Sequence, residues 1–285
     1  MTGPYFKIAG LLFSLFFYFL SFQTLSAQIS GRIQASSGRL KQISERGYIL
    51  VGLQKDYYPF HIEGKKSRGP GIDMEIAQIL AKSLGVELKV KFFNLPDLLK
   101  AVEKGDIDLS AGGISSSLER AKKNAFSEPY LVTTPGGLLS KRVLPPESES
   151  SEFLRERIRG LSDINKLGRL KIGVMKNTRN EDLLRNSQEF DRHKIIGFTD
   201  RAKLIRALLK GDIDLLVGDA ISIHSLQKTK KIPASFIPLV SPYREENISF
   251  VLPRGDAELE LYMNFFVRAI KSDGRLNKII TRYLK

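Results

Sequence analysis

An internal repeat constrains this chain more than any other feature of its sequence. Residues 98–109 return as residues 204–215, and eight of the twelve positions are identical. Each copy begins with the apolar spacing of a helix, reaches a glycine (Gly105 and Gly211) suited to the left-handed end of that helix, and continues as an apolar strand. A helix–glycine–strand unit that occurs twice, 106 residues apart, predicts two lobes of similar topology.

The rest of the chain alternates strands with helices. Such alternation predicts an α/β fold in which mostly parallel sheets are flanked by helices on both faces. We expect strands at residues 48–53, 86–93, 107–111, 170–175, 195–198 and 213–217, and helices at 72–84, 181–188, 203–210 and 259–284, the last interrupted at Gly274. A stretch of loop composition at 145–151 and a charged segment at 152–159 are expected to form a surface excursion near the crossing between the lobes.

The first 27 residues are typical of a secretory signal. Lys7 precedes an apolar run at 8–22, and small residues follow up to Ala27, after which we expect cleavage. The alternative is an uncleaved membrane anchor, although a spanning helix normally needs about 20 apolar residues. Export predicts a periplasmic protein.

Composition excludes several classes of function. The chain has no cysteine, and therefore no disulfide, thiol nucleophile or cysteine-ligated metal. Its formal charge of +14 is spread among acidic residues, which favours a solvated basic surface, and export argues against nucleic acid. His61, His193 and His224 lack the spacing of metal ligands. We expect neither a metal nor another cofactor.

The repeat also predicts where a ligand binds. Ligands of open parallel sheets bind beyond the carboxyl ends of the strands. Gly113 follows the strand of the first copy and Asp219 holds the equivalent place in the second, so the two are expected to face one cleft. Exposed backbone and the Ser115 hydroxyl on one side, with a carboxylate on the other, suit an ammonium group.

Arg120 occupies the first turn of a short helix that Ser117 is expected to cap. A cation is unfavourable at a helix N-terminus unless an anion lies between it and the free N–H groups. Two interpretations remain open from the residues alone: Arg120 binds an anionic group of a ligand, or it is a surface arginine paired with Glu119 or Glu128.

An ordered set of motifs resembles the polar amino-acid-binding proteins of ABC importers, the family 3 extracellular solute-binding proteins. The set comprises Tyr57-Tyr58-Pro59-Phe60, Gly71-Ile72-Asp73-Met74-Glu75, Ser115 to Arg120, Phe126-Ser127-Glu128-Pro129-Tyr130, Lys176-Asn177-Thr178 and Leu252-Pro253-Arg254-Gly255-Asp256. The resemblance implies a two-lobed periplasmic-binding-protein fold joined by two crossing strands, with residues 28–142 and 241–285 in lobe 1 and 143–240 in lobe 2. It also implies a monomer that delivers a small amino-acid-like ligand to an importer permease.

The resemblance assigns roles to particular residues. Arg120 and the Ser115 N–H would hold the α-carboxylate of the ligand, while the Gly113 carbonyl, the Ser115 hydroxyl and Asp219 would hold its α-ammonium. Tyr57 or Phe93 would supply an aromatic wall, unless these rings only pack in the core.

The sequence departs from the family in the second lobe. The family's Gly-Ser/Thr-Thr turn, which helps to hold the carboxylate, reads Asn177-Thr178-Arg179 here. Asn tolerates left-handed geometry, so the turn can persist with Thr178 in its usual role. Arg179 either binds a second anion of the ligand or points to solvent.

Two other functions stay open at this stage. Some members of this fold are cyclohexadienyl dehydratases, in which Glu181 would be a general acid or base; its other interpretation is a helix-start residue favoured by the dipole. Ile248 stands near the place where a lysine is expected in that enzyme. The third candidate is a sensory binding module with a partner in trans.

Overall fold

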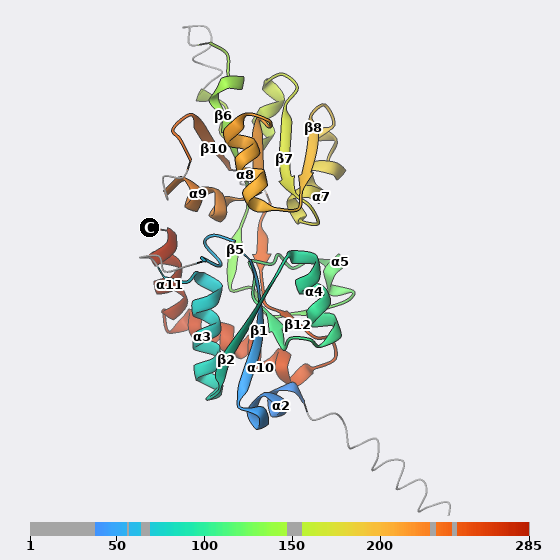
Figure 1. Ribbon diagram of the computed structural model, residues 1–285, viewed down its shortest axis with the longest axis vertical. Coiled ribbons are helices and arrows are strands. Elements are labelled where there is room, and N and C mark those ends of the chain that lie inside the picture. Colours follow the sequence, from blue (N-terminus) through green and yellow to red (C-terminus); the bar gives the residue numbers. More distant parts are fainter. Residues whose placement is uncertain are drawn as a thin grey trace, which may run out of the picture.

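The computed structural model describes residues 38–55, 57–63, 69–146, 156–228, 232–240 and 244–284. They form two α/β lobes, one above the other in Figure 1, and each contains a five-stranded sheet with helices against it. The predicted fold class is confirmed: each sheet is mostly parallel, with a single antiparallel strand, β12 in the first and β6 in the second. The predicted signal segment 1–27, and residues 152–155 of the charged segment 152–159, lie outside the described residues.

The first sheet has the strand order β2-β1-β3-β12-β4. Its strands are β1 (Tyr48–Gln54), β2 (Glu87–Phe93), β3 (Leu109–Ser110), β4 (Ala125–Phe126) and β12 (Val251–Leu252). The helices of this lobe are α2 (Arg39–Arg46), α3 (Ile72–Leu84), α4 (Leu95–Lys104), α5 (Leu118–Ala121), α10 (Ala257–Ser272) and α11 (Arg275–Leu284). Gly274, with φ 78°, separates the last two as predicted.

The second sheet has the order β10-β6-β9-β7-β8. Its strands are β6 (Pro135–Ser140), β7 (Lys171–Met175), β8 (Lys194–Phe198), β9 (Leu215–Asp219) and β10 (Phe236–Val240). The helices of this lobe are α7 (Arg179–Asn186), α8 (Arg201–Lys210) and α9 (Ala220–Lys228). Three 3-10 turns complete it: η1 (Lys141–Val143), η2 (Leu161–Lys166) and η3 (Gln188–Phe190). The chain enters this sheet at Pro135, before residue 143, where we expected the second lobe to begin.

Two antiparallel strands connect the lobes. β5 (Leu131–Thr133) pairs with β11 (Glu246–Ile248) in a separate two-stranded sheet, and both lie between the lobes in Figure 1. The chain passes outward along β5 and returns along β11 to β12, α10 and α11. Two short strands form a connection that bends readily, which is the geometry of a hinge.

The repeat is reproduced in three dimensions. Gly105 and Gly211 both adopt left-handed φ, 77° and 83°, and end α4 and α8. The second aspartate of each copy also plays the same role: Asp108 accepts a hydrogen bond from the Leu50 N–H at 2.7 Å, and Asp214 accepts one from the Lys171 N–H at 2.8 Å. Each aspartate therefore holds the chain that enters its own strand against the neighbouring parallel strand, β1 in the first lobe and β7 in the second.

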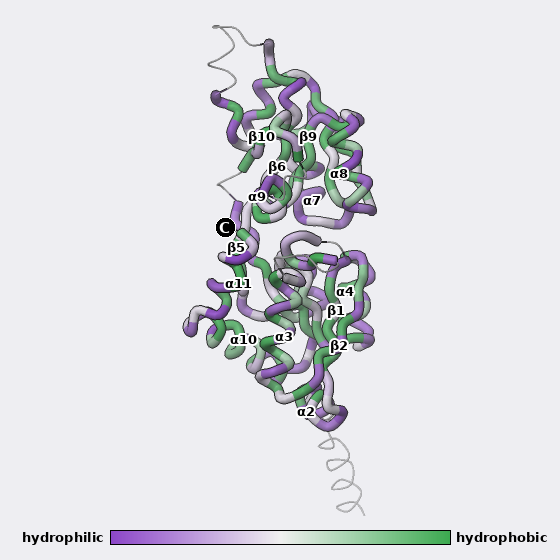
Figure 2. The backbone as a smooth tube through the Cα atoms, turned by 60° about the vertical axis from the view of Figure 1, so that its left-hand side comes forward, coloured by the Kyte–Doolittle hydropathy of each residue, from purple (hydrophilic) through white to green (hydrophobic). Residues whose placement is uncertain are grey.

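Each lobe has its own hydrophobic core. The buried residues group into four clusters, two in each lobe and one on either face of each sheet. In Figure 2 the strands at the centre of each lobe are mostly hydrophobic, whereas hydrophilic colours predominate on outer loops. Separate cores allow the lobes to move as rigid bodies. Within the described residues, no helix combines the length and the apolar character needed to cross a bilayer.

Candidate ligand-binding cleft

A cleft of about 840 Å³ lies where the two lobes face each other. Its position follows from the sheet order. In each lobe two neighbouring parallel strands, β1 with β3 and β7 with β9, continue into connections that leave in opposite directions, and such switch points open a crevice at the carboxyl edge. The structure brings together all the predicted site residues, because each lines this cleft: Tyr57, Phe93, Gly113, Ser115, Arg120, Thr178, Arg179 and Asp219.

Gly113 forms part of the first lobe's wall in a conformation that demands glycine. Its φ is 58°, and a Cβ atom there would lie 2.7 Å from the ring of Phe60. The Gly113 N–H donates to the buried carboxylate of Asp73 at 2.7 Å, and the Tyr130 hydroxyl donates to the same carboxylate at 2.6 Å. The sequence motif that contains Asp73 predicted no role for this residue, whereas the structure shows that it fixes the loop carrying Gly113.

Burial raises the pKa of Asp73 to about 7, although its two hydrogen bonds favour the ionised form. Because the folded pKa lies above the unfolded one, folded protein holds a proton between pH 4 and pH 7 that unfolded chain has released. Stability therefore falls as pH rises through this window, by up to about 4 kcal/mol, and levels off above pH 7.

We expect Asp73→Asn to remove this pH dependence. Its free energy of unfolding, measured by urea denaturation from pH 4 to pH 8, should converge with that of the wild type at low pH and exceed it at high pH. Asp106→Asn, which alters an exposed carboxylate, is the control. Parallel curves for wild type and Asp73→Asn would contradict the assigned shift.

Arg120 lines the cleft and pairs with neither Glu119 nor Glu128. Its Nη1 donates to the Ser115 carbonyl at 2.7 Å, and its Nη2 donates to the Asn177 carbonyl of the other lobe at 3.2 Å. Burial, reinforced by the positive charge of Arg179, lowers the pKa of Arg120. The surface-pair interpretation is therefore wrong, and the guanidinium lies where both lobes meet.

Asp219 and Tyr57 face each other across the cleft. The Tyr57 hydroxyl donates to Asp219 Oδ2 at 2.5 Å, and the Ser222 N–H donates to Oδ1 at 2.7 Å. Burial raises the pKa of Tyr57, and the nearby Asp219 carboxylate raises it further. Phe93 both lines the cleft and packs against the core cluster around Leu98. A position on the cleft wall and packing in the core are therefore compatible for this ring.

Glu246 is a cleft residue that the sequence analysis missed. It begins β11, is 7% exposed, and accepts a hydrogen bond from the Ser115 hydroxyl at 2.5 Å. Burial raises the pKa of this carboxyl, and Asp219 also raises it. No local signal marks Glu246, because its partner Ser115 is 131 residues away in the chain.

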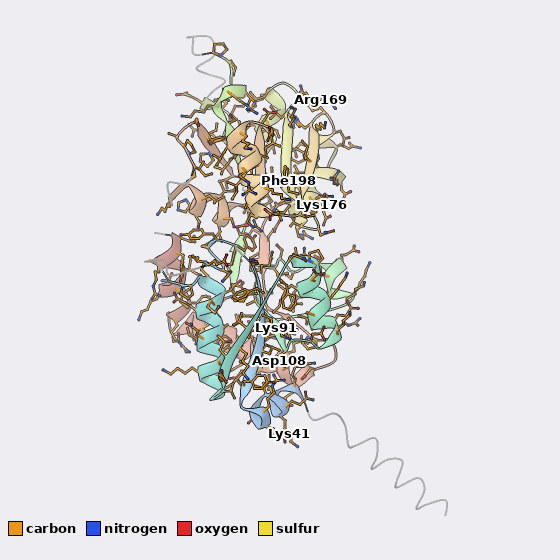
Figure 3. All side chains as sticks on the ribbon, viewed as in Figure 1. Lys41, Lys91, Asp108, Arg169, Lys176 and Phe198 are labelled. Carbon is orange, nitrogen blue, oxygen red and sulfur yellow. The ribbon has the colours of Figure 1, made fainter. Side chains whose placement is uncertain are left out.

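The turn of the second lobe keeps its shape without glycine. Asn177 adopts a φ of 61°, as its tolerance of this region predicts, and Thr178 caps α7 by accepting from the Glu181 N–H at 3.2 Å. The Thr178 hydroxyl also donates to the Met175 carbonyl at 2.7 Å. Arg179 then begins α7 and lines the cleft. Lys176 lies at the edge of the second lobe that faces the first (Figure 3).

Glu181 serves the turn and is absent from the cleft wall. Its Oε2 accepts from the Asn177 N–H at 2.8 Å and its Oε1 from Arg185 at 3.0 Å. Oε2 is thus engaged at the helix start and Oε1 further along α7, in agreement with the helix-start interpretation. Across the described ranges, no group of three or more His, Cys, Asp or Glu residues is placed to hold a metal ion.

The geometry agrees with comparison to known families. Residues 49–285 match the family described as bacterial extracellular solute-binding proteins, family 3, and the chain belongs to this family. The predicted resemblance is confirmed.

Individual relatives include both binding proteins and an enzyme. The chain is 27% identical to the L-cystine-binding protein TcyJ of Escherichia coli over 260 residues, covering 91% of each protein. It is also 27% identical to the cyclohexadienyl dehydratase of Pseudomonas aeruginosa over 263 residues, covering 92% of this chain and 91% of the enzyme. Among solved structures, the chain is similar to the ancestral amino acid-binding protein AncCDT-1, a precursor of cyclohexadienyl dehydratase, with a TM-score of 0.73 and 25% identity. The match covers 87% of this chain and 100% of the AncCDT-1 chain.

Proposed function

We propose that this chain is a periplasmic binding protein that captures an amino-acid-like ligand between its lobes and delivers it to the permease of an ABC importer. Membership of the solute-binding family supports this function. The observation that carries it is the presence of Arg120, from the first lobe, and Asp219, from the second, on the wall of one interlobe cleft. A guanidinium suits an α-carboxylate and a carboxylate suits an α-ammonium.

Calorimetric titration of the purified mature protein with the L-amino acids tests this function. At least one should bind stoichiometrically with micromolar or tighter affinity. Failure of all twenty common amino acids and of L-cystine would reject it.

The relative in Pseudomonas aeruginosa makes a dehydratase the second candidate. The structure supports binding over catalysis, because both oxygens of Glu181 are engaged by α7 and the turn before it and Ile248 is buried without a charge. Incubation with prephenate, followed by measurement of phenylpyruvate, separates the two. Turnover would establish the enzyme.

We expect ligand binding to shift the lobes toward a closed arrangement by bending at β5 and β11. Two hydrogen bonds already cross between the lobes in this structure, from the Tyr57 hydroxyl to Asp219 and from Arg120 to the Asn177 carbonyl, and a bound ligand would hold the lobes together in the same way. Small-angle scattering should therefore show a smaller radius of gyration at saturating ligand than without it. Superimposable profiles would contradict hinge closure.

A further inference from the structure

Two arginines begin the two helices that follow neighbouring strands of the second lobe. Arg179 is the first residue of α7 and Arg201 the first residue of α8. The positive end of the helix dipole makes this position unfavourable for a cation, and acidic residues are usual there. Two cations in this unfavourable position, at the same edge of one sheet, require a compensating negative charge nearby.

Neither arginine forms an ion pair within the described part of the protein, although the buried Glu246 carboxyl acts electrostatically on Arg179. No hydrogen bond or ion pair joins Arg179 or Arg201 to any described residue, whereas the described Arg142 pairs with Asp214 and Arg282 with Glu75. Two of the acids near them in sequence are already engaged, and Asp182 is a further acid in the first turn of α7. Asp200 caps α8 by accepting from the Lys203 N–H at 2.7 Å, and Glu181 is held by the turn before α7.

Both side chains belong to the wall of the ligand-binding cleft. β7 and β8 are paired in parallel with Met175 opposite Phe198, so α7 and α8 start from the same edge of the sheet. The Arg201 guanidinium reaches across to the first lobe, where it lies over the ring of Tyr57 at 3.8 Å from the ring centre. Stacking fixes the plane of the guanidinium and leaves its N–H edge available to an acceptor.

An unsatisfied amide lies beside these arginines. Asn180, the second residue of α7, is 8% exposed and lines the cleft, and its Oδ1 has no hydrogen-bond partner among the described residues. Buried polar groups normally have a partner, so an unmet amide oxygen on the wall of a cleft indicates a hydrogen-bond donor of a ligand nearby, such as an N–H or O–H group.

Comparison of the two repeats shows that an arginine at the start of the repeated helix is particular to the second lobe. Asn94 and Asp200 cap α4 and α8 in the same way, each accepting from the N–H three residues on. The residue that follows is Leu95 in the first lobe and Arg201 in the second. The common topology does not require an arginine at this position, since its counterpart is apolar.

We infer that Arg179 and Arg201 form a second anion subsite, and that the ligand is an α-amino acid carrying a second carboxylate. The inference rests on the proposed function, in which Arg120 and Asp219 hold the α-carboxylate and the α-ammonium. Arg179 and Arg201 are then the two guanidinium groups of the cleft without a hydrogen-bond or ion-pair partner among the described residues. A neutral amino acid offers them no anionic group, whereas a second carboxylate does.

Calorimetry with matched ligand pairs tests the inference. L-aspartate against L-asparagine and L-glutamate against L-glutamine differ in the second carboxylate. The tightest of the four ligands should carry that carboxylate and bind at least tenfold better than its partner. L-arginine is the cationic comparison.

Two variants locate the effect. Arg201→Leu installs the residue that stands at the equivalent place in the first lobe, and Arg179→Thr removes the other cation. Each should weaken the preferred dicarboxylate about ten- to a hundredfold, as for the loss of charge-assisted hydrogen bonds, and change its neutral partner less than threefold. Arg206→Gln, on an exposed part of α8 outside the cleft wall, is the control and should change neither.

The possible outcomes distinguish a failure of the second anion subsite from a failure of the proposed function. Preference for a neutral or cationic amino acid, or variants that weaken both members of a pair equally, would overturn the second subsite and leave the proposed function standing. No binding by any amino acid would overturn the proposed function and this inference with it.

Discussion

Arg120→Ala is expected to weaken binding of the cognate amino acid by roughly a hundredfold to several thousandfold. The guanidinium is the proposed partner of the ligand α-carboxylate, and it lies where both lobes meet. Removing one member of a desolvated, hydrogen-bonded charge pair costs about 3–5 kcal/mol, because the other member is left buried without a partner. Calorimetry with the ligand that the wild type binds measures the change.

Two further variants make this result interpretable. Arg120→Lys keeps the charge but loses the two-pronged geometry, so it should recover only part of the affinity. Arg268→Ala alters an exposed arginine that pairs with Glu128, away from the cleft, and should bind like the wild type. Unchanged affinity in Arg120→Ala would remove Arg120 from the carboxylate site.

Asp219→Asn should weaken the same ligand about ten- to a hundredfold while the fold is retained. The amide oxygen can still accept from the Tyr57 hydroxyl or the Ser222 N–H, so the local structure has a substitute partner. The ligand α-ammonium, in contrast, loses a charge-assisted hydrogen bond worth about 1.5–3 kcal/mol.

The α-keto acid that corresponds to the ligand provides the matched probe, because it lacks the ammonium group. Wild-type protein should prefer the amino acid strongly, and Asp219→Asn should lose most of that preference. Asp212→Asn, an exposed carboxylate of the second repeat, controls for the change in net charge. An undiminished preference in Asp219→Asn would show that another group holds the ammonium.

Much of the fold was predictable because local rules govern it. The 3.6-residue spacing, the glycine at each helix end and the apolar strand that follows are all contained within twelve residues, and both copies fold as they predict. The start of α7 was predicted two residues late, at Glu181, because Thr178 caps the helix and Arg179 already belongs to it.

β6 escaped the prediction because its sequence resembles a turn. Gly136 and Gly137 suggest a loop, yet here they allow close packing: a Cβ at Gly136 would lie 3.0 Å from the Ala220 backbone, and one at Gly137 would lie 2.8 Å from Leu215. Glycine in a strand often marks such a close approach. The cause is a neighbour about 80 residues further along, which no local pattern reveals.

The cleft was predictable to the extent that it follows the repeat. Gly113 and Asp219 were found from their equivalent places, whereas the position of Arg120 at a helix start left two interpretations open and the family resemblance assigned its role. Glu246 was not found, since its role depends on contact with Ser115 across the fold. Arg201 carried the same signal as Arg120, a cation at the first turn of a helix, and applying that argument to α8 would have marked it as a candidate.

The strand order has a consequence for the sequence of events during synthesis. All strands of the second sheet lie within residues 135–240, whereas β3 and β4 of the first sheet are joined only through β12, at residues 251–252. As the chain emerges from its amino end, the second lobe is the first to possess every strand it needs. The first sheet gains its joining strand only when residues 251–252 are present, so we expect it to close after the second sheet.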